Sequence, residues 1–164
     1  MRAAASAAIE ATLAERIAPG AYPVLGAYWP IQAEWDPRPY LTRTIEAGGM
    51  VALPVARRPA GPLEFRLWTP DAPMTAGLWD IPHPAEAAVV TPSALLIPLV
   101  GFDGAGHRLG NGGGYYDRTL AALTPRPFAV GVGFALGRLP SIAPQPHDQP
   151  MDLIVTEAGV QSTN

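Results

Sequence analysis

A glycine-rich segment between an apolar run and an amphipathic run is the feature that most constrains this chain. Residues 94–100 are almost continuously apolar, which predicts a strand covered on both faces of a sheet. Four glycines lie within residues 110–114, and the pattern from about 114 to 123 predicts a helix. A strand, a loop and a helix in this order place the loop at the carboxyl end of a sheet strand, where open α/β folds bind ligands.

The rest of the hydrophobic pattern predicts a single α/β domain over residues 1–164. Apolar residues four positions apart indicate helices near 9–17 and 37–47. Short apolar or alternating runs indicate strands, near 22–28, 50–55, 63–67, 128–134 and 151–156. Strands that alternate with helices favour a mixed, mostly parallel sheet flanked by helices. Residues 70–84, with Trp79 and His83, read as a long irregular connection of the kind that is often functional.

Composition excludes several classes of function. The net charge of −3 gives no reason to expect nucleic acid or anionic lipid as a partner. The chain has no cysteine, which excludes disulfides, a thiolate nucleophile and cysteine-bound zinc. No uninterrupted apolar run approaches the length of a membrane span. We expect a cytoplasmic protein that is a monomer or a weak homo-oligomer.

The residue types around the glycines favour a nucleotide over a simple turn. Glycine lets backbone N–H groups approach an anion closely, and a helix that starts behind the loop adds the positive end of its dipole. Arg108 and Arg118 flank the loop with permanently charged forks, and Asp117 is placed to bind a magnesium ion. The candidate nucleotide contacts are Arg108, Leu109, Gly110, Asn111, Gly112, Gly113, Gly114, Tyr115 and Tyr116. Because Tyr115 and Tyr116 are adjacent on a helix, we expect only one of them to meet a ligand.

The segment from Ile97 to Arg118 resembles the signature of the 5-formyltetrahydrofolate cyclo-ligases, also called methenyltetrahydrofolate synthetases. The shared pattern is a buried strand ending in Pro, then Phe-Asp, a short glycine turn, Arg-Leu-Gly, the glycine loop and Tyr-Tyr-Asp-Arg. Weaker matches lie at 28–36, 49–54, 63–68 and 146–157, so the resemblance covers about residues 24–157. It implies a mixed sheet with a cleft on one side. It also implies the reaction of ATP with 5-formyltetrahydrofolate to give 5,10-methenyltetrahydrofolate, ADP and phosphate.

The resemblance also suggests roles for individual residues. Arg118 and Tyr116 would be catalytic, and Asp117 with Asp148 would hold Mg²⁺; for Asp148 a loop carboxylate that caps its own backbone is an equal alternative. Glu34 would bind the pterin of folate, with a solvated loop acid as the alternative. Trp29, Phe65, Trp68 and Tyr116 would line the folate slot, although core packing is the usual role of an aromatic residue. Asp103 fits either a turn cap or a partner of Arg108.

One family feature has no counterpart in this sequence. The family begins with a helix carrying Lys-x-x-x-Arg, whereas residues 1–18 here resemble the second helix and all eleven cationic side chains are arginine. We therefore expect the chain to enter the family pattern one helix late, with Arg2 or Arg16 as substitutes. Two hypotheses are open: an active cyclo-ligase, or a non-catalytic folate- or nucleotide-binding relative. A purely structural domain would require the glycine loop to be only a turn.

Overall fold

The computed structural model describes residues 2–109, 114–142 and 148–162. Its three helices in these ranges are α1 (Arg2–Arg16), α2 (Arg38–Glu46) and α3 (Tyr115–Ala122). The main sheet contains β1 (Val24–Gly26), β2 (Met50–Val55), β3 (Glu64–Trp68), β6 (Val89–Val90), β7 (Ala94–Pro98), β10 (Phe128–Val132), β11 (Leu153–Thr156) and β12 (Gly159–Ser162). Two hairpins form separate two-stranded sheets: β4 (Met74–Ala76) with β5 (Pro82–Pro84), and β8 (Gly101–Phe102) with β9 (Arg108–Leu109).

The sheet has a parallel centre and antiparallel edges. Its strand order is β12-β11-β10-β7-β1-β2-β3-β6. Strands β11, β10, β7, β1 and β2 pair in parallel, whereas β12, β3 and β6 are antiparallel additions. The mixed, mostly parallel sheet predicted from the sequence is therefore confirmed.

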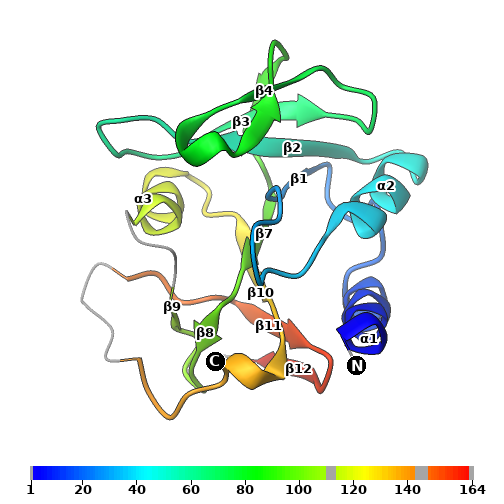
Figure 1. Ribbon diagram of the computed structural model, residues 1–164, viewed down its shortest axis with the longest axis vertical. Coiled ribbons are helices and arrows are strands. Elements are labelled where there is room, and N and C mark those ends of the chain that lie inside the picture. Colours follow the sequence, from blue (N-terminus) through cyan, green and yellow to red (C-terminus); the bar gives the residue numbers. More distant parts are fainter. Residues whose placement is uncertain (1, 110–113, 143–147, 163–164) are drawn as a thin grey trace.

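Helices cover both faces of the sheet. Figure 1 shows α1 and α2 on one side of the strands and α3 on the other. Alternate residues of β7 enter the two cores: Leu96 packs in the cluster that contains Ile9 and Leu13 of α1, and Leu95 in the cluster that contains Leu120 of α3. Every residue of β7 is buried, which explains why its sequence is apolar without alternation. No helix among the described residues is long and apolar enough to cross a membrane.

The chain path creates a crevice between β1 and β7. From β1 the chain passes through α2 to β2 on one side, and from β7 it passes through α3 to β10 on the other. Because these crossovers run in opposite directions on opposite faces, the carboxyl ends of β1 and β7 are left uncovered at a topological switch point.

Two features of the fold differ from the expectation. Residues 70–84 are not irregular, because β4 and β5 form a hairpin around a short 3₁₀ turn, Leu78–Asp80. The hairpin β8–β9 separates β7 from the glycine-rich segment, so that segment does not follow the buried strand directly. Strands of two or three residues carry too little periodicity to be detected in sequence.

Candidate active site

A pocket of about 480 Å³ opens at the crevice between β1 and β7. Its walls come from residues at or just beyond the carboxyl ends of β1, β2 and β7, from the first turn of α3, from the 78–83 segment, and from Leu63 before β3 and Arg108 of β9. The lining residues are Tyr28, Trp29, Ile31, Gln32, Glu34, Pro54, Ala56, Leu63, Leu78, Trp79, Ile81, His83, Pro98, Arg108, Tyr115 and Tyr116. A mostly apolar cavity with a few convergent polar groups is typical of a small-molecule site.

Glu34 is held in the pocket wall by its own loop. Its side chain is only 7% exposed, and Oε1 accepts a hydrogen bond from the backbone N–H of Ile31 at 3.0 Å. The loop is fixed from both sides, since the Tyr28 hydroxyl donates to the Trp35 carbonyl at 2.7 Å and Arg2 donates to the Ala33 carbonyl at 3.1 Å. The solvated loop acid considered as an alternative does not describe this position.

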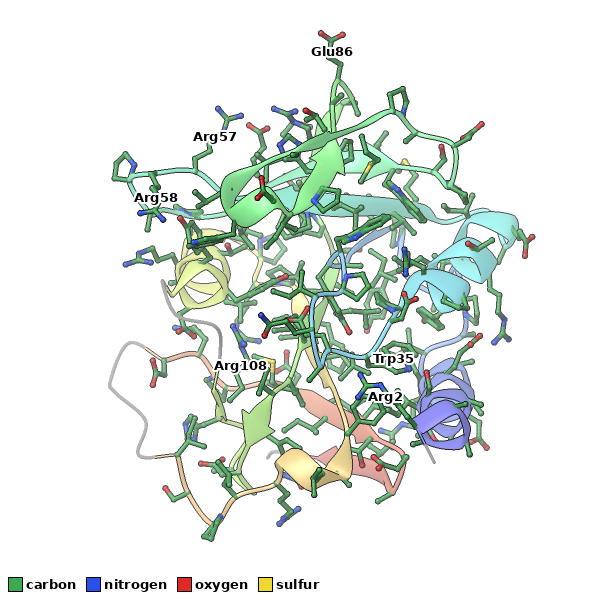
Figure 2. All side chains as sticks on the ribbon, viewed as in Figure 1. Arg2, Trp35, Arg57, Arg58, Glu86 and Arg108 are labelled. Atoms are coloured by element: carbon green, nitrogen blue, oxygen red, sulfur yellow. The ribbon has the colours of Figure 1, made fainter. Side chains whose placement is uncertain are left out.

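Arg108 brings a cation to the same pocket, and Figure 2 marks where this side chain lies in the fold. Its guanidinium donates to the Pro98 carbonyl at 3.3 Å and lies 5.1 Å from the centroid of the Tyr116 ring. Nε is buried and has no hydrogen-bond partner within the described part of the chain. Burial lowers the pKa of Arg108, while the negative charges of Asp117, Glu34 and Asp148, among others, act against this shift. A buried donor without a partner beside a cavity is suited to an anionic ligand.

Both tyrosines at the start of α3 line the pocket, and the expectation that only one of them meets a ligand stays a prediction. The pocket reaches two adjacent positions in the first turn of α3. The Tyr115 hydroxyl donates to the Arg57 carbonyl at 2.8 Å, and its ring meets Trp79 edge-on at 5.8 Å. Burial raises the pKa of Tyr116, with Arg108 acting in the opposite direction, so this hydroxyl stays protonated and can donate.

The aromatic residues proposed for the slot divide into two groups. Trp29 lines the pocket, with the Arg38 guanidinium 4.6 Å from its ring centroid. Phe65 and Trp68 do not line it: they are 2% and 5% exposed and fill the two cores on opposite faces of the sheet. The expectation for these two residues is corrected, because β3 lies inside the sheet and the pocket begins at the Leu63 position before it.

The two proposed metal ligands come close together. Asp117 lies in the first turn of α3, and its Oδ1 accepts the backbone N–H of Gln149 at 2.9 Å. Asp148 precedes Gln149 in the chain, so this hydrogen bond brings Asp148 close to Asp117. Both carboxylates also act on Arg108. The described residues contain no group of three or more metal-ligating side chains. Two carboxylates with phosphate oxygens and water nevertheless suit Mg²⁺, which rarely depends on an all-protein cage.

The helix start at Gly114 is shaped for close approach. Gly114 has φ +65°, and a Cβ there would lie 3.1 Å from the Arg118 guanidinium, so Arg118 folds back over the first turn.

Of the predicted nucleotide contacts, Gly110, Asn111, Gly112 and Gly113 lie outside the described residues. Leu109 ends β9 beside Arg108.

Several pocket residues had no clear signal in the sequence. Tyr28, Ile31 and Pro98 lie in segments that match the family pattern, but no feature of the sequence marked these three residues themselves as pocket residues. Trp79 and His83 had one signal, their place in a long connection, and both line the pocket. Asp103 proves to be a turn cap: its Oδ1 accepts the backbone N–H groups of Ala105 and His107 at 3.0 Å each.

Comparisons with known proteins agree with this geometry. A family model described as the 5-formyltetrahydrofolate cyclo-ligase family matches residues 2–157. The 5-formyltetrahydrofolate cyclo-ligase of Mycolicibacterium smegmatis is 36% identical over 140 residues, which cover 79% of this chain and 71% of that protein. The Escherichia coli K12 protein of the same name is 39% identical over 93 residues, covering 53% and 51%.

Solved structures show the same fold. The NMR structure of Aquifex aeolicus 5,10-methenyltetrahydrofolate synthetase superposes with a TM-score of 0.80 at 26% identity, covering 97% of this chain and 81% of that one. The 5,10-methenyltetrahydrofolate synthetase from Mycoplasma pneumoniae has a TM-score of 0.77 at 22% identity, covering 95% and 87%, which supports the fold. The chain belongs to the 5-formyltetrahydrofolate cyclo-ligase family.

Proposed function

We propose that this chain converts 5-formyltetrahydrofolate and ATP to 5,10-methenyltetrahydrofolate, ADP and phosphate, with Mg²⁺ bound to the nucleotide. The observation that carries the proposal is one pocket lined by a buried carboxylate, Glu34, and by Arg108, whose Nε has no hydrogen-bond partner among the described residues. Family membership supports it. We also propose that the protein acts in the cytoplasm as a monomer or a weak homo-oligomer.

The reaction is difficult because a formamide oxygen is a poor leaving group. Transfer of the γ-phosphoryl group of ATP to the formyl oxygen releases ADP and turns that oxygen into a phosphate ester. Nitrogen N10 of the folate then attacks the formyl carbon, the carbon–oxygen bond breaks, and phosphate leaves with its bonding electrons as N10 loses its proton. Phosphoryl transfer of this kind needs alignment and charge compensation more than covalent help.

The folate would occupy the apolar part of the pocket. A carboxylate can accept two hydrogen bonds from the aminopyrimidine edge of a pterin, and Glu34 is desolvated and fixed by Ile31 for that purpose. Trp29 and Trp79 offer aromatic surface on the pocket walls.

The phosphates would lie at the start of α3. Arg108 and Arg118 can pair with phosphate oxygens, and the helix N-terminus adds its dipole. Asp117 and Asp148 are the side chains that would hold Mg²⁺, which would neutralise charge on the phosphate oxygens. The Tyr116 hydroxyl, whose burial keeps it protonated, is available as a donor beside Arg108.

The test is formation of the methenyl product, followed by its absorbance, in complete mixtures and in mixtures lacking ATP or Mg²⁺. Glu34→Gln should raise the KM for 5-formyltetrahydrofolate by about tenfold or more, because one charge-assisted pair is lost. Glu46→Gln, on the exposed end of α2, is the matched control and should have no effect. Folate binding without product would favour a non-catalytic relative, and no binding would contradict both.

A further inference from the structure

His83 lines the pocket but has no part in the proposed reaction so far. It lies on β5, which pairs with β4 and packs on β2 and β3. The side chain is half-buried, and it belongs to the pocket wall formed by the 78–83 segment. The hairpin therefore brings one imidazole to the same cavity as Glu34 and Arg108.

The imidazole of His83 is held by contacts on two of its sides. Nδ1 lies 2.9 Å from the Pro84 carbonyl, which can only accept, so the proton of the neutral ring sits on Nδ1. The same carbonyl accepts a hydrogen bond from Arg66 at 3.1 Å. The ring packs closely on Gly77, because a Cβ at that position would lie 2.5 Å from Cδ2 and 2.9 Å from Nε2. The neutral ring therefore offers Nε2 as an acceptor.

The other titratable side chains of the pocket are not available as proton acceptors. Burial raises the pKa of Tyr28 and the pKa of Tyr116, so both hydroxyls stay protonated. Tyr115 already donates its hydroxyl to a backbone carbonyl. The carboxylate of the pocket is the proposed partner of the pterin, and its arginine is a permanent cation. Among the described residues that line the pocket, His83 is the side chain left to accept a proton at neutral pH.

We infer that His83 is the base that removes the proton from folate N10 during ring closure. The inference rests on the proposed function. N10 attacks the formyl carbon and becomes positively charged, and Nε2 of His83 then takes its proton while the electrons of the N–H bond stay on N10. The carbon–oxygen bond breaks, and phosphate leaves with the bonding electrons. Protonated His83 afterwards releases the proton to solvent.

The position of the imidazole agrees with this role. N10 joins the pterin to the aminobenzoyl group, so it lies near the middle of the folate. A pterin at Glu34 and phosphates at the start of α3 leave the wall of the 78–83 segment for N10. A base on that wall meets N10 from the side opposite to neither substrate group.

Charged groups of both signs surround the imidazole. Arg66 of β3 donates to the same carbonyl as Nδ1 and is paired with Glu64 at 2.8 Å. Asp80 lies in the turn before β5, the pocket adds Glu34 and Arg108, and β2 and β4 carry no charged residue. A protonated imidazole cannot accept a proton, so ring closure should slow as the pH is lowered from about 8 to about 5.

A single turnover separates ring closure from phosphoryl transfer. With protein in excess over 5-formyltetrahydrofolate and with labelled ATP, ADP reports the first step and methenyl absorbance the second. His83→Asn keeps an N–H at the Nδ1 position for the Pro84 carbonyl and removes Nε2. ADP should form at the wild-type rate, whereas methenyl formation should slow about a hundredfold and lose its fall toward low pH.

Three further variants distinguish a base from a structural residue. Gly77→Ala retains the histidine but places a Cβ against its ring; φ at this position is −109°, which alanine adopts, so the methenyl step alone should slow. His83→Ala should regain part of the methenyl rate when imidazole is added. Thr75→Ala changes the exposed residue paired with His83 across the hairpin, and as the matched control it should leave both steps unchanged.

The outcomes separate the inference from the reaction. An unchanged methenyl rate in His83→Asn, equal slowing of ADP and methenyl formation, or a loss in His83→Ala that imidazole does not restore would overturn the inference and retain the proposed reaction. Wild-type protein that forms neither ADP nor methenyl product would contradict the reaction, and the inference with it.

Discussion

Replacing Arg108 by methionine should remove activity without destabilising the fold. Within the described residues, the fold gives Arg108 one hydrogen bond, to the Pro98 carbonyl at 3.3 Å, and no partner for Nε. Methionine has a similar length and fills the same space without a charge. The Arg108 side chain would therefore serve ligand binding at the expense of the stability of the fold, a trade-off common at active sites.

The sign of the stability change follows from the pKa of Arg108. Burial lowers this pKa in spite of the nearby negative charges, including Asp117, Glu34 and Asp148, so folding disfavours the charged form. Arginine stays protonated in the folded and the unfolded chain at all ordinary pH values, so the penalty is present throughout and has no pH window. Arg108→Met should leave the free energy of unfolding unchanged or raise it by about 1 kcal/mol.

The expected effect on catalysis is much larger. A preorganised donor at a phosphoryl-transfer site contributes about 3–4 kcal/mol to transition-state stabilisation, so kcat should fall by about a hundred- to a thousandfold. Arg108→Lys restores the charge without the planar fork and should recover only part of the rate.

The assay pairs steady-state formation of methenyl product with urea unfolding. Arg66→Met is the comparison for stability, because Arg66 donates to Glu64 at 2.8 Å and to the Pro84 and Ala85 carbonyls at 3.1 and 3.0 Å. Losing those bonds should cost about 2 kcal/mol. A loss of comparable size in Arg108→Met, or turnover within threefold of wild type, would show that Arg108 is a structural residue.

Three further predictions concern individual residues. Asp117→Asn should lower Mg²⁺-dependent kcat by about a hundredfold and leave urea unfolding unchanged, since Oδ1 can still accept the Gln149 N–H; equal loss of turnover and stability would contradict the metal role. Gly114→Ala should raise the KM for ATP several-fold more than that for folate, because φ is +65° and the new Cβ displaces Arg118; equal effects in the same steady-state assay would point to general distortion. Asp103→Ala should cost about 2 kcal/mol at pH 7, measured by urea unfolding. Burial alone would raise the pKa of Asp103, but backbone N–H donors and His107 hold it below its ordinary 3.8. Its stabilisation is therefore complete above that value and is lost as pH falls through the depressed pKa, so a cost that does not shrink as the pH is lowered would refute the assignment.

The sequence was most informative where burial decides residue type. The continuous apolar run of β7 and the four-residue spacing of Ile9 and Leu13 led to the observed elements, because each pattern reports one or two buried faces. Glu34 was identified through the family resemblance and Arg108 through its place beside the glycine loop, and both lie in the pocket. A motif carries information on contacts that local periodicity lacks.

The failures concern geometry between elements. Phe65 and Trp68 are aromatic residues of β3 that the resemblance placed in the folate slot, yet they lie in the two opposite cores of the sheet. Whether an aromatic residue faces a pocket or a core depends on which strands flank its own. Antiparallel pairing of β3 with β2 put both residues inside the sheet. Trp79 was placed by the β4–β5 hairpin, whose three-residue strands leave no pattern to read.

The arrangement explains how one small domain can bring two substrates into contact. Under the proposed function, the crevice at the β1–β7 switch point would hold a flat ligand beside Glu34, and the start of α3 would bind an anion at the end of the same crevice. Arg108 lies between them, packed on Tyr116 of α3 and influenced by Glu34 on one side and Asp117 on the other. A cation shared in this way would compensate charge on both reactants only when both are present. The lack of a partner for its Nε among the described residues is therefore consistent with a site completed by its ligands.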